Sequence, residues 1–430
     1  MRELQVAIFE DYACENFLPL THTRPAFDLV CGAATLRSRI SNLFRGSEPL
    51  LFARNHLAAY LESKEKVHVN RPEMISNATL FLNGLLILTK RLAGALPKVP
   101  EGQVGVKEGR LVYACFGPER AREFAAKLSK PFTSLDLSQL ERAATSKAEV
   151  RDAQLLTYPW EIAKLNAEVL KSDLASMQKS RAGKVHSRAA VLGRRRDLSI
   201  CSGSVIEPGV VIDTRNGPVH IGPGSTVQSN SLIQGPSYVG SGTRILPFTC
   251  IHGGSSVGNR CTVGGCVESS VIHGYSEVRS CFVGHSYVGE WVDLGAMTAV
   301  SESKDGYGTV EVNAGGQKVD TGEVKVGAFF GDYVRASAAT VIAAGKKIGT
   351  ASRLHGVVTE DVPSFTVYDK TSGGKPTEAV FESVIEAQRR MFNMRKVEHT
   401  AADITLLKSV YDLTREERKA AGMAQTRPSI

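Results

Sequence analysis

The stretch IGPGSTVQSNSLIQGPSYVGSGTRILPFTCIHGGSSVGNRCTV, residues 221–263, places an aliphatic residue at every sixth position. Three of these residues, Ile221, Val239 and Val257, are each followed by glycine, so a period of eighteen lies on the period of six. An amphipathic helix repeats every 3.6 residues and a half-buried strand every two, and neither period fits. Three short strands of about six residues therefore complete one coil of a parallel β-helix, whose coils bury their apolar side by stacking.

The same period extends in both directions from this stretch. Residues 264–281 contain a slip of one position, and residues 301–323 are polar, rich in glycine and predicted to form an excursion loop. Loops that leave a rigid scaffold commonly carry binding groups, although simple insertion drift is an equal alternative. The remaining inward positions are Ile200, Ile206 and Ile212, then Phe282, Val288, Leu294 and Val300, then Val324, Phe330, Ala336, Ile342, Ile348 and Leu354.

The chain divides into four predicted segments. Residues 1–157 form an α/β domain, residues 158–184 a linking helix, residues 185–360 the hexapeptide β-helix and residues 361–430 a C-terminal helical extension. In the first segment, expected strands alternate with expected helices, so a parallel sheet is the default. The strands are expected at 4–9, 49–52 and 79–82, and the helices at 33–44, 57–62, 119–128 and 137–143. The extension is expected to cap the open end of the solenoid or to pack on the first domain.

Composition indicates an ordinary globular protein. The 430 residues are 42% hydrophobic and 22% charged, with a formal net charge of +8. Because the basic residues are dispersed, we favour an enzyme that handles anionic substrates over a nucleic-acid binder. The eight cysteines form no Cys-x-x-Cys pair, which favours reduced thiols and a cytoplasmic location. We expect neither a signal peptide nor a membrane span.

Three stretches resemble a known family. They are LPLTHTRP (residues 18–25), YPWE (158–161) with Asn166, and GHSYVGEWVDLGA (284–296). Together with an α/β domain before a hexapeptide β-helix, they resemble, over residues 1–360, the bifunctional enzymes that acetylate glucosamine 1-phosphate and couple it to UTP. The closer resemblance is to divergent sugar-phosphate nucleotidyltransferases. It implies a left-handed β-helix, a homotrimer, and an acyl-CoA such as acetyl-CoA bound between coils of two subunits.

The resemblance also implies a nucleotidyl site at the ends of the N-terminal strands. Such a site binds an NTP or nucleotide sugar and a sugar phosphate, with Mg²⁺ if the site is active. The family's glycine-rich loop is replaced here by EDYAC (residues 10–14). Candidate nucleotide- or sugar-binding residues are Asp11, Arg24, Arg37, Asn83 and Gly84, and Asp11 is also the candidate metal ligand. The alternative is a domain that binds a sugar nucleotide without turning it over.

Acyl transfer on the β-helix needs a base, and histidine is the usual one. His285 is the best candidate, with Tyr287 and Asp293 within one coil and Arg279 near the place of the family's histidine. Glu268 falls in the slip and is expected to face a sugar. Lys346, Lys347 and Arg353 form a basic cluster for the phosphates of CoA. The alternatives are a turn histidine bonded to backbone and solvated coil corners.

We therefore expect a cytoplasmic transferase of nucleotide-sugar metabolism. It would combine an acyl-CoA-dependent β-helix with a degenerate or divergent nucleotidyltransferase domain. The alternative is a non-catalytic regulator or scaffold that binds a sugar nucleotide with the same two folds.

Overall fold

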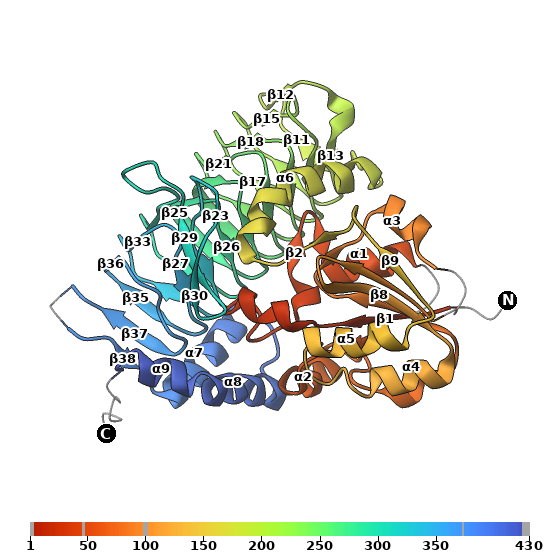
Figure 1. Cartoon of the computed structure of the whole chain (residues 1–430). Coiled ribbons are helices and arrows are strands. Elements are labelled where there is room, and N and C mark those ends of the chain that lie inside the picture. Colours follow the sequence, from red (N-terminus) through yellow and green to blue (C-terminus); the bar gives the residue numbers. More distant parts are fainter. Residues whose placement is uncertain (1–3, 45–47, 98–101, 372–373, 424–430) are drawn as a thin grey trace.

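The largest part of the protein is a parallel β-solenoid of about ten turns, consistent with a left-handed β-helix (Figure 1). The computed structural model describes residues 4–44, 48–97, 102–371 and 374–423. One eight-stranded sheet forms the first face of the solenoid, and an eighteen-stranded sheet folds around the other two faces.

Each face is a stack of short parallel strands. The first face consists of β13 (Leu198–Ile200), β16 (Val219–Ile221), β19 (Ser237–Val239), β22 (Ser255–Val257), β24 (Val271–Ile272), β26 (Tyr287–Val288), β31 (Phe329–Phe330) and β34 (Lys347–Ile348). The second face consists of β11 (Lys184–Val185), β14 (Val205–Ile206), β17 (Thr226–Val227), β20 (Arg244–Ile245), the starts of β23 (Thr262–Glu268) and β25 (Glu277–Gly284), β27 (Asp293–Leu294), β32 (Arg335–Ala336), β35 (Arg353–His355) and β37 (Thr366–Asp369). The third face consists of β12 (Ala190–Leu192), β15 (Val211–Asp213), β18 (Leu232–Gln234), β21 (Cys250–Ile251), the ends of β23 and β25, β28 (Ala299–Val300), β33 (Val341–Ile342) and β36 (Val357–Val358).

The core of the solenoid confirms the period of six. The predicted inward residues from Ile221 to Val263 all belong to one cluster and are fully buried. Two predicted inward positions are wrong. Val283 rather than Phe282 points inward, because β23 and β25 each run directly from the second face to the third and so shorten the corner. Val324 is 44% exposed, because the chain rejoins the solenoid only after it.

The excursion after β28 contains a β-hairpin. Its strands are β29 (Glu311–Ala314) and β30 (Gln317–Asp320), which pair antiparallel. Val312 and Ala314 of this hairpin are buried in one cluster with Ala13 and Phe17 of the N-terminal domain. The excursion therefore attaches the solenoid to the first domain rather than projecting freely into solvent.

The N-terminal domain has a mixed sheet in the order β4-β1-β5-β8-β7-β9, so the prediction of a parallel sheet is wrong for its second half. Strand β1 (Gln5–Phe9) is parallel to β4 (Leu50–Phe52) and β5 (Thr79–Asn83), whereas β8 (Arg110–Phe116) is antiparallel to β5 and β7 (Gln103–Lys107). The reason is a two-residue turn at Glu108 and Gly109, both with positive φ, which closes β7 and β8 into a hairpin. The last strand is β9 (Ser146–Glu149), and the helices are α1 (Leu36–Leu43), α2 (Asn55–Glu65), α3 (Lys90–Ala95), α4 (Pro118–Ala125) and α5 (Ser134–Ala143).

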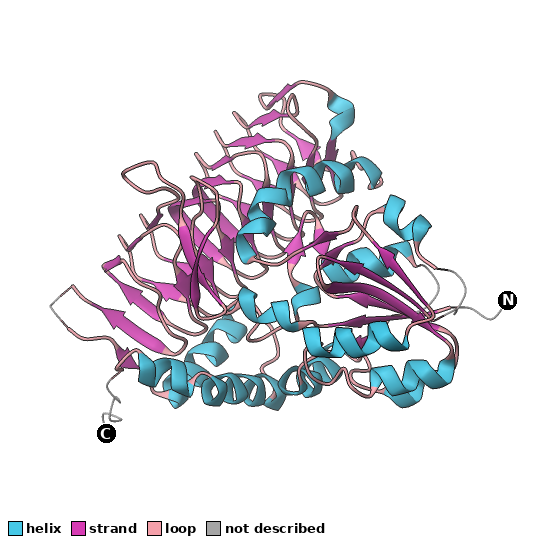
Figure 2. Ribbon diagram, in the orientation of Figure 1, coloured by secondary structure: helices cyan, strands magenta, loops and turns pink. Residues whose placement is uncertain are grey.

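Helices connect the two folds at both ends (Figure 2). Helix α6 (Pro159–Ser176) lies along the first face, where Asn166 donates to the carbonyl of Gly254 at 2.7 Å. After the solenoid come α7 (Phe381–Met394), α8 (Ala401–Leu413) and α9 (Arg415–Ala420). The ring of Tyr411 packs on Phe365 of the last coil, and Asp403 pairs with Lys64 of α2 at 2.6 Å. The extension thus contacts both the end of the solenoid and the first domain.

Within the described residues, no helix combines the length and the apolar character that crossing a bilayer requires.

Candidate functional site

A histidine and a glutamate meet where the excursion leaves and rejoins the solenoid. His285 Nδ1 lies 2.8 Å from a carboxylate oxygen of Glu302, and Lys325 Nζ lies 2.6 Å from the other oxygen. Lys325 also reaches Glu268 at 3.3 Å. The side chains of His285 and Glu302 are 21% and 11% exposed, so the pair is sheltered but reachable from solvent.

The stacking of coils brings these residues together. His285 and Glu302 are seventeen residues apart, about one coil, and so occupy neighbouring levels of the same corner. A side chain on Gly284 would collide with Glu302, since a Cβ there would lie 1.9 Å from its carboxylate oxygen. Lys325 enters from the far end of the excursion, just before Val326 donates its N–H to the carbonyl of Glu302. Gly284 therefore leaves room for Glu302, and the excursion brings Lys325 back beside it.

The carboxylate of Glu302 determines which ring nitrogen of His285 carries the proton. Burial raises the pKa of Glu302, but the hydrogen bonds from His285 and Lys325 outweigh it and hold that pKa below its usual value. The carboxylate therefore accepts from His285 Nδ1–H, which leaves Nε2 with the lone pair. The arrangement can orient a neutral imidazole to remove a proton from a bound acceptor.

Three side chains at this corner resemble a metal site in composition. Glu268, His285 and Glu302 offer ligand atoms that all lie within 4.8 Å of one another. The ammonium group of Lys325 contacts both carboxylates and supplies the positive charge that a cation would bring. We therefore assign no metal ion to this corner.

Glu302 and Lys325 were not among the residues predicted for the site. Glu302 carried a signal in the sequence, since it lies about one eighteen-residue period beyond His285 and thus on the same corner. Lys325 carried none, because the length of an excursion does not tell where its end returns. Glu268, predicted to contact a sugar, lies beside His285 through its partner Lys325.

The other predicted catalytic residues lie on different faces from His285. Tyr287 is buried on the first face, where its hydroxyl accepts from the N–H of Val30 at 3.0 Å. Asp293 and Arg279 belong to the second face, and Arg279 pairs there with Glu277. The structure therefore does not bring these three side chains to the imidazole.

The predicted CoA cluster is also divided. The carbonyl of Lys346 accepts from Phe329, and the preceding residue, Gly345, donates to Gly327, which itself donates to the carbonyl of His285. Lys346 therefore lies on the same corner as His285, about two coils or roughly 10 Å further along. Lys347 lies on the first face, where burial lowers its pKa, and Arg353 lies on the second face. Only Lys346 has the position expected for a phosphate contact near His285.

The carboxyl ends of the N-terminal strands are filled by protein. Asp11 follows β1, and its carboxylate accepts from the N–H of Ala13, from Asn83 Nδ2 at 3.0 Å and from Arg110 Nε at 2.9 Å. Asn83 also donates to the carbonyl of Leu111, and a Cβ on Gly84 would lie 2.9 Å from the carbonyl of Phe9. These residues close the turn in which a nucleotide site was predicted.

Arg24 crosses from the first domain to the solenoid. Its guanidinium contacts His273 Nε2 at 2.8 Å, Glu290 at 3.5 Å and, more closely, Asp332. Thr23 donates to the same Asp332 carboxylate at 2.5 Å. The side chains of Arg24 and Asp332 are 10% and 5% exposed, so this ion pair is buried between the two folds.

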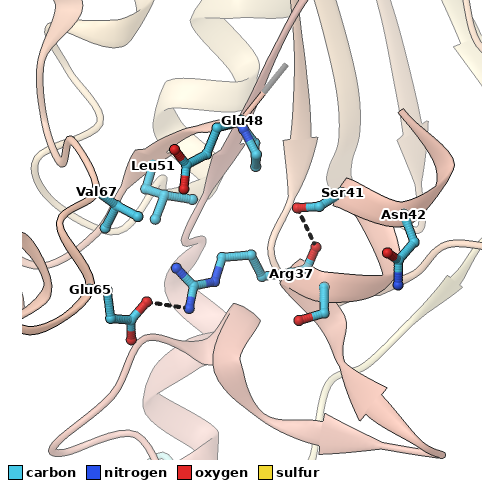
Figure 3. A pocket seen from close by; sticks show the side chains of 9 residues that line it. Arg37, Ser41, Asn42, Glu48, Leu51, Glu65 and Val67 are labelled. Carbon is cyan, nitrogen blue, oxygen red and sulfur yellow. Dashed lines mark hydrogen bonds and ion pairs between the residues drawn. The ribbon is translucent and has the colours of Figure 1, made fainter. Parts of the chain in front are cut away.

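Arg37 lines a small surface cavity of about 300 Å³ between α1 and β4 (Figure 3). It pairs with Glu65 at 2.5 Å and with Asp28 at 2.7 Å, so its charge is balanced. A larger cavity of about 740 Å³ lies between α1, α3 and α6. Lys90, Arg39 and Asp173 are among its lining residues, and Arg39 pairs with Asp173.

Comparison with known proteins agrees with the resemblance of the N-terminal domain to nucleotidyltransferases. Residues 6–182 match the family described as sugar nucleotidyl transferase. The matched residues comprise the N-terminal domain and helix α6. Over 97 residues, the chain is 34% identical to the bifunctional sugar-1-phosphate nucleotidylyltransferase/acetyltransferase of Sulfurisphaera tokodaii. That alignment covers 22% of this chain and 24% of the relative.

Solved structures similar to this chain include two UDP-N-acetylglucosamine acyltransferases. The enzyme of Francisella novicida is 15% identical with a TM-score of 0.34, and the match covers 57% of this chain and 95% of that one. The enzyme of Campylobacter jejuni is 14% identical with a TM-score of 0.25, and the match covers 55% and 83%.

Proposed function

We propose that this protein transfers an acyl group from an acyl-CoA to a sugar phosphate or nucleotide sugar at the corner occupied by His285. The observation that carries the proposal is the His285–Glu302 pair, with its carboxylate held by Lys325. A carboxylate that fixes the tautomer of a neutral histidine is the arrangement that general-base catalysis requires. The relationship to a bifunctional nucleotidylyltransferase/acetyltransferase supports the substrate class.

The proposed reaction needs one proton acceptor and one leaving group. His285 Nε2 removes a proton from the hydroxyl or amine of the acceptor as that group attacks the thioester carbonyl. Glu302 stabilises the imidazolium that forms. The tetrahedral intermediate collapses, the bond from carbon to sulfur breaks, and the imidazolium returns the proton to the departing CoA thiolate. Lys346, on the same corner, would contact a phosphate of CoA.

For the N-terminal domain we propose sugar-nucleotide recognition rather than nucleotidyl transfer. The carboxylate oxygens of Asp11 accept hydrogen bonds from Arg110, Asn83 and the N–H of Ala13, so this side chain does not fit a Mg²⁺ ion. The cavity of about 740 Å³ beside α6 has the size of a small-molecule site. Lys90 lines it and could meet a phosphate.

We propose a cytoplasmic homotrimer as the working form. In support, an unbroken row of eight apolar side chains faces outward along the third face, on strands that pair in register. The row is Val211, Leu232, Cys250, Cys266, Phe282, Ala299, Val341 and Val357. Val341 and Val357 are 42% and 56% exposed in the isolated chain, and a second copy would cover them. The free state of all eight cysteines is typical of a reducing compartment.

The test is thiol release from acyl-CoA in the presence of hexosamine phosphates and UDP-sugars. We expect His285→Ala to lower kcat by about 100- to 10,000-fold and Glu302→Gln by a smaller factor. His186→Ala, which removes an exposed histidine of the same solenoid, is the matched control and should leave kcat unchanged. Full activity of His285→Ala would refute the assigned base, and no turnover by folded protein across the panel would refute the acyltransferase.

A further inference from the structure

The second face of the solenoid carries a ladder of stacked side chains, five of them charged and one a threonine, away from the His285 corner. The rungs are Arg244, Thr262, Glu277, Asp293, Arg335 and Arg353, each paired in register with the next. Consecutive rungs of a parallel sheet are about 4.8 Å apart. Side chains of the same sign are therefore direct neighbours at Arg335 and Arg353.

The last two arginine side chains of this second-face ladder form no ion pair with any described residue. The side chain of Arg335 makes no hydrogen bond or ion pair with any residue that the structure describes, although Asp293 lies one rung away. Arg353 donates only to the neutral oxygens of Ser383, at 3.2 and 3.3 Å, and its Nε is buried without a partner. Burial and repulsion by Arg353 lower the pKa of Arg335 and outweigh the attraction of Asp293. Two half-buried guanidinium groups thus lie side by side, and the carboxylate of Asp293 is the in-register neighbour of only one of them.

The surroundings add positive charge. Arg279 and Arg395 share the single carboxylate of Glu277. On helix α7 beside the ladder, Glu386 is engaged by Arg389 and Arg390 of its own helix. Five arginines, Arg244, Arg279, Arg335, Arg353 and Arg395, therefore share this surface with two carboxylates, Glu277 and Asp293. The excess is three positive charges.

Helix α7 supplies a second feature of the same kind. Its N-cap, Val380, offers no side-chain hydrogen bond, and Ser383 in its first turn is the residue that Arg353 contacts. Ser383 and Val384 donate their N–H groups to the carbonyl of Val380, and the exposed Glu382 shares this turn. The positive end of a fourteen-residue helix still favours an anion at this end.

We propose that Arg335, Arg353 and the first turn of α7 form a binding site for a phosphate group. The planar guanidinium fork matches the oxygens of a phosphate, and two forks one rung apart can hold one phosphate between them. The site lies on a different face from His285 and Glu302, so it is separate from the proposed acyl-transfer site. A phosphorylated small molecule bound here would tie the C-terminal extension to the solenoid.

The test is calorimetric titration of the full-length protein with inorganic phosphate at low ionic strength. Saturable binding is expected, and Arg335→Gln and Arg353→Gln should each weaken it about tenfold or more. Arg244→Gln is the matched control, because it removes an arginine from the same ladder four rungs from Arg335, and it should bind as the unmodified protein does. His285→Ala should also bind normally, which separates this site from the proposed acyltransferase.

Two further arms identify the ligand and guard against misfolding. Glucosamine 1-phosphate and CoA are titrated in the same way, and the one that binds more tightly than inorganic phosphate indicates the natural source of the group. In phosphate-free buffer, Arg335→Gln should melt at the same or a higher temperature, because it relieves repulsion with Arg353. A lower melting temperature, equal loss of binding in Arg244→Gln, or no saturable binding would each overturn the proposal.

Discussion

Removal of the Arg24 guanidinium should open the contact between the two folds. In Arg24→Met, Asp332 keeps its bonds from Thr23 and from the N–H of Glu290 but loses its positive partner. Breaking one side of a buried ion pair typically costs about 3–5 kcal/mol. Because Asp332 retains two donors, we expect the lower end, about 3 kcal/mol, which corresponds to about a 100-fold change in an opening equilibrium.

The assay is hydrogen exchange of the backbone amides in residues 22–29, which lie buried at this contact. Their exchange should accelerate about 100-fold in Arg24→Met. Arg71→Met is the control, because Arg71 is 49% exposed in its pair with Glu62, and exposed pairs contribute about 0–1 kcal/mol. The double variant with Asp332→Asn should open less than the sum of the single variants. Unchanged exchange in Arg24→Met, or additive effects in the double variant, would show that this ion pair does not hold the folds together.

Three further changes test other parts of the fold. Burial raises the pKa of Glu290 to about 7 and outweighs the opposing effect of Arg24, so the folded protein retains a proton that the unfolded chain releases near pH 4.5. In thermal melts, the unmodified protein should therefore lose stability relative to Glu290→Gln as the pH rises from about 4.5 to 7. Parallel pH profiles of the two proteins would contradict this. Gly265→Ala should lower the free energy of unfolding in urea by about 3 kcal/mol or more, because the φ of Gly265 is +93° and the new Cβ would lie 2.1 Å from the carbonyl of Cys281. Gly306→Ala is the control and should leave that free energy unchanged, because Gly306 has open space around it. Ile251→Ala should cost about 2–5 kcal/mol in the same assay because Ile251 is fully buried in the stack, and a cost below about 1 kcal/mol would argue against tight stacking there.

The solenoid was predictable because its period is a local property repeated many times. Each inward aliphatic residue sits six positions from the next, and neither a long-range contact nor a turn type has to be known. The prediction failed where the corner geometry changes. Inward residues from Val263 to Val288 are spaced by four, five, six, five and five positions, so the fixed period selected Phe282 in place of Val283.

The N-terminal sheet and the candidate site were only partly predictable. The direction of β8 depends on a two-residue turn at Glu108 and Gly109, which alternation of strands and helices does not reveal. His285 was selected from the sequence because a histidine at a coil corner is a candidate base, and its catalytic role stays a prediction. The role of Arg24 depends on Asp332, 308 positions away, and such a contact is set by how two folds dock. The prediction that Tyr287 acts beside His285 relied on their closeness in sequence. The two residues lie on either side of a bend in the coil, so their side chains point to different places.

The hairpin of the excursion has a mechanical consequence. Its strands are anchored on the first domain, while Lys325, a few residues beyond β30, grips Glu302 beside the imidazole. Glu323 adds a tether by pairing with Lys164 of α6 at 2.6 Å. A tilt of the first domain against the solenoid would therefore move Lys325, and with it the position of the Glu302 carboxylate beside His285.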